Sequence, residues 1–177
     1  TSTEPAVRAT DNKKVEYIYF SSNRPGGKGG MDIWYTKRTA DGEYEEPQLV
    51  KGNVNTVGDE ISPFYADSAQ TLYFSSDVHP GFGGFDVFKT SQVPDGERKV
   101  WTPVQNLGKP VNSGADDMFF TISKDLTYGY LTSNRQGSIP LNGIATASDD
   151  IFGWENFNYG LEGTMKVIGN DATQLDQ

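Results

Sequence analysis

The sequence predicts an all-β protein built from three copies of one small antiparallel sheet. The first observation is repetition, because YFSSNRPGGKGGMDIW at 19–34 returns as YFSSDVHPGFGGFDVF at 73–88. A weaker third copy begins with YLTSNR at 130–135 and ends with DDIF at 149–152. The second observation is composition: aromatic residues make up 12% of the chain, and Gly and Pro number 20 and 9. Many aromatic residues and many turns are typical of β-structure.

Each repeat contains the signals of four short strands. In the second repeat we expect strands at 61–66, 72–76 and 86–90 and near 101–107, and the third repeat begins with one at 118–122. These runs are rich in β-branched or aromatic residues and are bounded by Gly, Pro, Asn and Asp. No segment of 11 or more residues shows convincing helical periodicity. Four strands in a unit of roughly 50 residues indicate a β-propeller blade.

The repeats predict how the chain is divided. Residues 1–157 are expected to form three blades, which are at about 4–59, 60–116 and 117–157. Closed propellers contain about 4–8 blades, so three blades predict part of a larger ring or a ring completed by another copy. An open arc would expose apolar faces at its ends. Residues 158–177 leave the repeat pattern, and we expect them to begin a following β-sandwich domain.

Composition also disfavours several kinds of partner. The chain has no cysteine, which excludes disulfides and thiolate metal sites. Its formal net charge is −9, which disfavours binding to nucleic acid or anionic lipid. No stretch approaches the roughly 18 apolar residues of a membrane span. We therefore expect no nucleic-acid partner and no direct membrane insertion.

An aspartate follows the glycine-rich loop in every repeat, at Asp32, Asp86 and Asp150. We expect it to accept hydrogen bonds from backbone N–H groups, with the glycines at 26, 27, 29 and 30 supplying positive φ and close approach. Residues shared by all repeats usually define the repeated unit, which favours this structural interpretation over ligand binding. Phosphate binding is disfavoured, because GGKGG lacks the GxxxxGK[ST] order and precedes a strand instead of a helix.

The glycine loops and the connections between repeats are expected at one end of the blades, because successive strands alternate in direction. The candidate binding residues there are Arg24, Lys28, His79, Phe82 and Arg135. Phe82 aligns with Lys28 and is expected to be exposed. His79, the only histidine, has no repeat partner and is expected to be solvated. Arg24 and Arg135 align and are expected to pair with loop carboxylates at the surface.

Neighbouring acids leave a calcium-binding alternative open. The candidate ligands are Asp59, Glu60, Asp116, Asp117 and Asp149. Hard cations require several oxygen ligands. Against this alternative, no D-x-[DN]-x-[DN]-G run is present, and adjacent residues of a strand point to opposite faces. We therefore expect no cofactor, with calcium as the alternative.

Catalysis is not expected from these residues. The serines at 21, 22, 75, 76 and 133 recur at strand ends, where hydroxyl groups satisfy turns. Glycoside hydrolysis needs two carboxyl groups about 5–9 Å apart, which is a property of the fold. A glycan-binding or glycan-cleaving propeller therefore stays open as an alternative. It would have a cleft at the loop end with two acids and Phe82 as a stacking ring.

The quoted segments resemble the WD-like (TolB-type) β-propeller repeats of bacterial envelope proteins. More narrowly, residues 72–88, 101–117 and 129–152 are similar to repeats in OmpA-family proteins of Bacteroidetes-type bacteria, and the resemblance spans about 4–155. It implies a periplasmic, outer-membrane-associated protein in which a β-sandwich and a peptidoglycan-binding domain follow the propeller. One branch of the family belongs to the type IX secretion apparatus. The sequence departs from the pattern at 77–79, where Asp-Val-His replaces Asn-Arg, and in the longer third loop.

Residues and resemblance together predict a non-enzymatic scaffold for protein–protein interactions in the cell envelope. The resemblance implies a link between peptidoglycan and an outer-membrane secretion apparatus. The expected partners are envelope proteins, and peptidoglycan is reached only through a neighbouring domain outside this chain.

Overall fold

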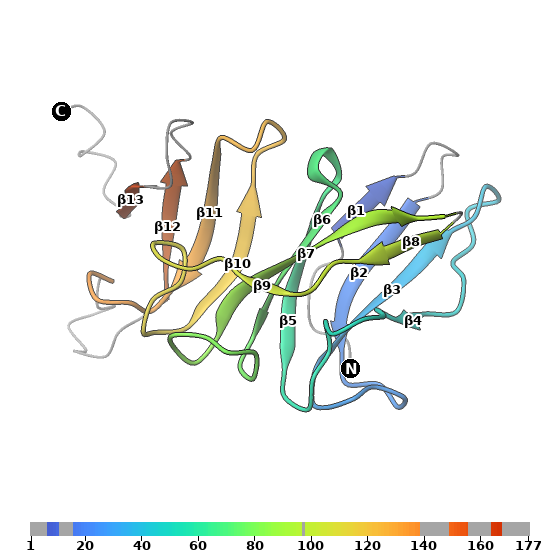
Figure 1. The fold of residues 1–177 in the computed structure, drawn as a ribbon, viewed down its shortest axis with the longest axis horizontal. Coiled ribbons are helices and arrows are strands. Elements are labelled where there is room, and N and C mark those ends of the chain that lie inside the picture. The colour runs from blue at the N-terminus through green and yellow to red at the C-terminus, as the bar shows by residue number, and fades with distance from the viewer. Residues whose placement is uncertain (1–6, 11–15, 97, 139–148, 156–163, 168–177) are drawn as a thin grey trace.

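The computed structural model describes residues 7–10, 16–96, 98–138, 149–155 and 164–167, which form three antiparallel sheets and contain no α-helix (Figure 1). The sheets stand in a row, with the second sheet between the first and the third. The all-β prediction is therefore confirmed. Within these residues, no helix is long and apolar enough to cross a membrane.

The strands follow one another in chain order within each sheet. The first sheet contains β1 (Val7–Thr10), β2 (Glu16–Ser22), β3 (Asp32–Arg38) and β4 (Gln48–Leu49). The second contains β5 (Glu60–Ala66), β6 (Thr71–Ser76), β7 (Asp86–Asp95), β8 (Arg98–Trp101) and β9 (Gln105–Asn106), with the 3-10 turn η1 (Asp67–Ala69) between β5 and β6. The third contains β10 (Asp117–Ile122), β11 (Tyr128–Ser133), β12 (Asp150–Glu155) and β13 (Thr164–Val167).

Two elements differ from the expected pattern. β7 continues to Asp95 and turns back as β8, so the second sheet has five strands instead of four, because β9 also pairs with β7. Thr164–Val167, which we expected in a following domain, pairs with β12 as the fourth strand of the third sheet. The segments at 1–6, 11–15 and 168–177 lie outside the described residues, as does most of the third glycine loop.

The repeats align in three dimensions as well as in sequence. In all three sheets the repeated aspartate pairs with the last serine of the preceding strand, as in the pair Ser76–Asp86. The first strands of the second and third sheets also share a β-bulge. Its residues Ser62 and Phe119 occupy equivalent positions and have φ of 53° and 52°. A bulge increases the local twist of a strand, so both strands enter their sheets in the same way.

The core lies between adjacent sheets. Side chains alternate across a strand, so Leu72 and Phe74 of β6 face the first sheet, whereas Tyr73 faces the third sheet. The cluster between the first two sheets contains Tyr19, Ile33, Val50, Val54, Tyr65, Leu72, Phe74 and Phe88. The cluster between the second and third contains Ala66, Tyr73, Val87, Val111, Phe120, Leu131 and Phe152. Each cluster takes side chains from two sheets, so burial of these residues holds the row together.

Replacement of Leu72 by Ala should lower the free energy of unfolding by about 2–5 kcal/mol, because Leu72 is fully buried between two sheets. The exposed Val57→Ala is the matched control and should change that free energy by less than about 0.5 kcal/mol. Urea denaturation followed by tryptophan fluorescence measures both. Equal losses in the two variants would contradict the packing described here.

Candidate functional site

The repeated aspartates close their own glycine loops. Oδ2 of Asp32 accepts hydrogen bonds from the backbone N–H groups of Lys28 (2.9 Å) and Gly29 (3.3 Å). Oδ2 of Asp86 accepts the equivalent bonds from Phe82 (2.7 Å) and Gly83 (3.0 Å). Both aspartates are buried, and Oδ1 of each receives no hydrogen bond from the described residues. One carboxylate oxygen therefore holds the loop in each of these two repeats.

The glycines act mainly by close approach. Of the four glycines in the first loop, only Gly26 has a positive φ, of 96°. A Cβ at Gly29 would collide with the backbone of Val57, and a Cβ at Gly83 would collide with that of Ala115. Both neighbours belong to the connection that leads into the next sheet. The expectation of positive φ at all four positions is therefore wrong, and the glycines let each loop touch the following connection.

A second aspartate links each loop to the next sheet. Oδ1 of Asp116 accepts a hydrogen bond from the backbone N–H of Phe85 in the second loop (3.0 Å). The backbone N–H of Asp116 donates to Oδ1 of Asn134 in the third sheet (2.9 Å), and Nδ2 of Asn134 donates to Oδ2 of Asp116 (3.0 Å). At the preceding junction, Asp59 makes the corresponding bonds to Met31 and Asp77. Each of these acids therefore joins two neighbouring sheets.

A buried asparagine completes each connection. Oδ1 of Asn112 accepts a hydrogen bond from the backbone N–H of Val87 (2.8 Å), and its Nδ2 donates to the carbonyl of Val87 (2.8 Å). Asn55 makes the same pair of bonds to Ile33, at 2.6 and 3.0 Å. The side-chain amide thus replaces a neighbouring strand, which satisfies both backbone groups of a buried residue. The sequence places these asparagines in the connections between repeats, which does not by itself reveal this role.

The second acid of each adjacent pair points into its own connection. Oδ2 of Asp117 accepts hydrogen bonds from the backbone N–H and hydroxyl of Ser113, at 2.6 and 2.9 Å. Glu60 accepts the equivalent bonds from Thr56, and a further bond from the Ser76 hydroxyl (3.0 Å). Burial raises the pKa of Glu60, and these hydrogen bonds oppose the rise. In these two pairs, Asp59–Glu60 and Asp116–Asp117, the adjacent acids therefore bond to different partners.

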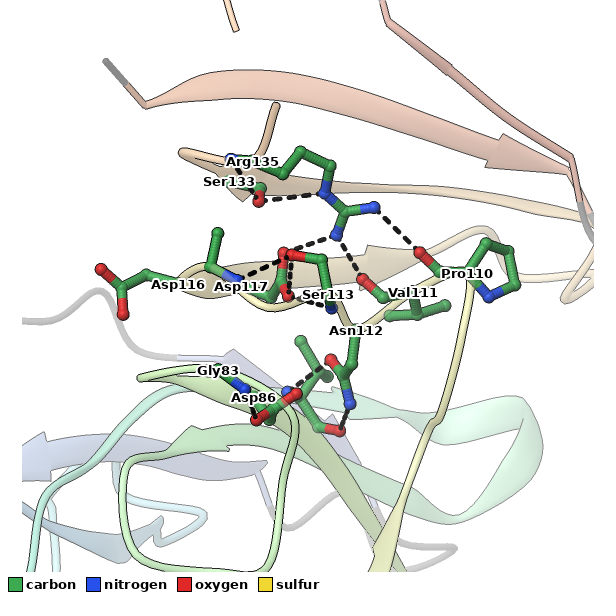
Figure 2. A network of polar contacts seen from close by, with 12 residues as sticks. Gly83, Asp86, Pro110, Val111, Asn112, Ser113, Asp116, Asp117, Ser133 and Arg135 are labelled. Carbon is green, nitrogen blue, oxygen red and sulfur yellow. Dashed lines mark hydrogen bonds and ion pairs between the residues drawn. The ribbon is translucent and has the colours of Figure 1, made fainter. Parts of the chain in front are cut away.

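Arg135 ties the third sheet to the connection that enters it (Figure 2). Its Nη2 forms an ion pair with Asp117 and donates to the carbonyl of Val111, and its Nη1 donates to the carbonyl of Pro110 (2.9 Å). The carboxylate of Asp117 is fully buried and the Arg135 side chain is largely buried. Arg135 therefore pairs with a carboxylate as expected, but the pair is buried instead of at the surface, because the connection folds over its guanidinium.

His79 takes the corresponding place at the other junction. Its Nε2 lies 3.0 Å from the carbonyl oxygen of Val54, which is the equivalent of Val111, and a carbonyl can only accept, so Nε2 carries the hydrogen. The imidazole packs against Phe74 and Phe88, with ring centroids 5.9 and 5.1 Å away. The expectation that His79 is solvated is therefore wrong. Its role escaped sequence comparison because it lies one position later in the loop than the aligned arginines.

The remaining predicted binding and metal-ligand residues differ in exposure and in their partners. Phe82 is exposed, and Lys109 Nζ lies 5.7 Å from the centre of its ring. Lys28 Nζ donates to the carbonyl of Asn55 (3.0 Å). The exposed Asp149 lies beside the third loop, most of which is outside the described residues. In the part of the chain that the structure describes, no group of three or more His, Cys, Asp or Glu residues could hold a metal ion.

A cleft that the sequence analysis did not anticipate lies between the first and second sheets. Its volume is about 640 Å³, within the range of about 300–1,000 Å³ typical of small-molecule sites. Residues at the ends of β2, β3 and β7 that lie away from the glycine loops contribute to it. The aromatic residues that line it are Tyr17, Tyr19, Tyr35, Tyr65 and Trp101. The structure therefore offers two candidate sites: the loop end and this cleft.

The tyrosines of the cleft are in an environment that disfavours ionisation. Burial raises the pKa of Tyr65 to about 12 and also raises the pKa of Tyr19. The Tyr65 hydroxyl donates to Oε1 of Gln92 at 3.3 Å. Both rings therefore carry neutral hydroxyl groups at neutral pH.

Comparison of the chain with known protein families finds no matching family model, and comparison with curated proteins finds no match. Functional inference therefore depends on the geometry described above.

Arg135→Ala should lower the free energy of unfolding by about 3–5 kcal/mol, because it leaves the buried Asp117 carboxylate without its cation. Arg24→Ala is the matched control, since Arg24 occupies the equivalent repeat position but has no carboxylate partner among the described residues. The control should cost less than about 1 kcal/mol. Urea denaturation measures the free energy of unfolding of both variants. Similar losses would show that the Arg135–Asp117 ion pair is not what stabilises the protein at this position.

A second test concerns the raised pKa of Tyr65. An unfolded tyrosine ionises near pH 10, so between pH 10 and about 12 the unfolded state loses phenolic protons before the folded state does. The free energy of unfolding should therefore fall as the pH rises through this window. Tyr65→Phe should make the fall shallower, as measured by urea denaturation at a series of pH values. If the slope of the free energy of unfolding against pH is the same in Tyr65→Phe, the raised pKa does not belong to Tyr65.

Proposed function

We propose that the three sheets are successive blades of a β-propeller and that the protein is a non-enzymatic scaffold for other proteins of a bacterial cell envelope. The observation that carries the proposal is the outer face of the third sheet. Tyr130 and Ile151 are 42% and 57% exposed there, whereas the equivalent Tyr73 and Val87 are 8% and 0% exposed. Large apolar side chains gathered on one exposed face indicate an interaction site.

The repeat itself supports one kind of occupant for this face. Tyr73 and Val87 belong to the apolar cluster that the second sheet shares with the third, and Phe120 of β10 supplies one of the rings that cover them. The same arrangement holds one junction earlier, where Tyr65 of β5 stacks on Tyr19 at 5.3 Å. A further blade, placed with its first strand against Tyr130 and Ile151, would repeat this packing. The occupant that we propose is therefore another repeat of the same kind.

The opposite end of the row supports the same conclusion. Arg24 lies over Phe20 and Trp34, with its guanidinium 4.8 and 5.4 Å from the ring centres. Its Nε donates to the Ser22 hydroxyl (3.2 Å), as that of Arg135 does to its own serine. Its Nη1 and Nη2 have no acceptor among the described residues, whereas those of Arg135 hold the preceding connection. Arg24 is thus equipped to hold the connection of a blade that precedes the first.

The non-enzymatic part of the proposal rests on the use of the repeated polar groups. Asp32, Asp59, Asp86 and Asp116 accept backbone N–H groups, and Asp117 pairs with Arg135. These bonds stabilise the protein's own loops and junctions. The repeated acids therefore have structural partners, which supports a role other than catalysis. The periplasmic, outer-membrane-associated location, and a role linking peptidoglycan to a secretion apparatus through a neighbouring domain, come from the sequence resemblance.

A photo-crosslinking amino acid at Ile151 of the full-length protein tests this proposal in intact envelopes. It should react with the first strand of another repeat, because that strand covers the equivalent position in the second sheet. Mass spectrometry identifies the linked peptide. The crosslinker at the exposed turn residue Lys124 is the control and should give far less product.

Two outcomes would count against the proposal. If folded protein with the crosslinker at position 151 gives no linked repeat peptide, the proposal that a further blade covers this face is wrong. Affinity purification of the same crosslinked protein should recover other envelope proteins. Recovery of none would contradict the proposed scaffold role.

A further inference from the structure

We propose that the cleft between the first and second sheets binds an acidic oligosaccharide, one that carries carboxylate groups on its sugar rings. This ligand site lies apart from the loop end and goes beyond the scaffold role. It differs from the glycan cleft considered from the sequence, which was expected at the loop end with two acids and Phe82.

The cleft is built in part by a hairpin that is longer in the second repeat than in the first. β7 has 10 residues, whereas its counterparts β3 and β12 have 7 and 6. Its extension pairs with β8, and this hairpin reaches toward the first sheet (Figure 1). β8 places Lys99 and Trp101 in the cleft. The first repeat has only a single bridge at this place, between Arg38 and Tyr44, so the longer hairpin distinguishes the second repeat from the first. Insertions in a repeat often lie on its binding face.

Aromatic rings form a continuous wall in the cleft. Tyr19 and Tyr65 stack, and the Trp101 ring meets both edge-on with centroids 6.3 Å away. Tyr35 lies 6.1 Å from Tyr19 and 6.2 Å from Tyr17, which extends the wall along the first sheet. Tyr17, Tyr35 and Trp101 are only partly buried. Aromatic side chains offer a flat apolar body with a polar edge, which matches the C–H face and hydroxyl rim of a sugar ring.

The charges in the cleft are opposite to those of the chain as a whole. The chain has a formal net charge of −9, yet Lys37, Lys51 and Lys99 line the cleft and, among the described residues, no Asp or Glu does. The nearby carboxylate of Asp67 adds to the burial that raises the pKa of Tyr19 and Tyr65. Lys37 is paired with Glu45 at 3.6 Å. Lys51 forms no ion pair with a described residue, and Lys99 Nζ donates to the amide oxygen of Gln70 at 2.9 Å. Two ammonium groups therefore remain for the carboxylates of a ligand, in charge-assisted hydrogen bonds.

Polar groups suited to hydroxyls accompany the lysines. The side-chain amides of Gln70 and Gln92 line the cleft. Gln70 already bonds to Lys99 and to the carbonyl of Asp67, whereas Gln92 Nε2 has no acceptor among the described residues and offers its N–H groups to a ligand. Tyr19 also lines the cleft and is nearly fully buried. Stacking surface, cations and amides together fit a carboxylated sugar.

Isothermal titration of the whole chain tests this proposal with oligosaccharides of galacturonic acid and of glucuronic acid. At least one should bind at least about tenfold more tightly than a neutral maltose-series oligosaccharide of equal length. Lys51→Gln and Lys99→Gln should each weaken that binding about five- to tenfold. Both lysines are exposed, so the variants should remain folded. Lys124→Gln, at an exposed turn of the third sheet, is the matched control and should change nothing.

An acidic peptide of glutamate residues separates sugar recognition from simple attraction of charge. Weak peptide binding, together with tight binding of an acidic sugar, supports the proposal. Peptide binding as tight as that of the acidic sugars would overturn it, as would equal binding of the neutral sugar or no binding of either acidic sugar. Unchanged affinity in the Lys51 and Lys99 variants would overturn the assigned cleft. None of these results alters the crosslinks expected from Ile151, so the two proposals fail separately.

Discussion

The row of sheets depends on satisfying backbone groups where one sheet passes into the next. Each junction brings a glycine loop, a connection and a new strand together in a buried place, where unpaired N–H and C=O groups are costly. Asn112 and Asp116 supply the missing partners at one junction, and Asn55 and Asp59 supply them at the other. Because these bonds fix the loops, the apolar clusters between sheets can pack in the same way twice.

Much of this arrangement could be predicted from the sequence, because it is repeated. The strand positions, the loop aspartates and the gathering of polar residues at one end all follow from aligned copies. The burial of Arg135 could not be predicted, because it depends on how the preceding connection folds over the guanidinium. The cleft could not be predicted either. Its lining comes from residues as distant as Tyr17 and Trp101, and it depends on strand β8, where the first repeat has only a single bridge between Arg38 and Tyr44.

The loop end and the cleft are built from the same sheets but use charged side chains differently. At the loop end, most charged groups form hydrogen bonds or ion pairs within the protein, as Arg135 and Asp117 do. In the cleft, Lys51 and Lys99 lack such carboxylate partners among the described residues. A repeated scaffold can carry a specialised site in this way, because an extension of one sheet leaves the junctions unchanged.

The imidazole of His79 has a consequence for how related proteins are recognised. It reaches the carbonyl of Val54, which is equivalent to the Val111 carbonyl bound by Arg135, from a loop position displaced by one residue. The two junctions thus place a hydrogen-bond donor at the same point, although the residue type and its position in the loop differ. Profiles that score each column separately would penalise this loop, although its architecture is intact. Remote relatives of this chain are therefore better sought through the geometry of the donor and carbonyl than through a consensus.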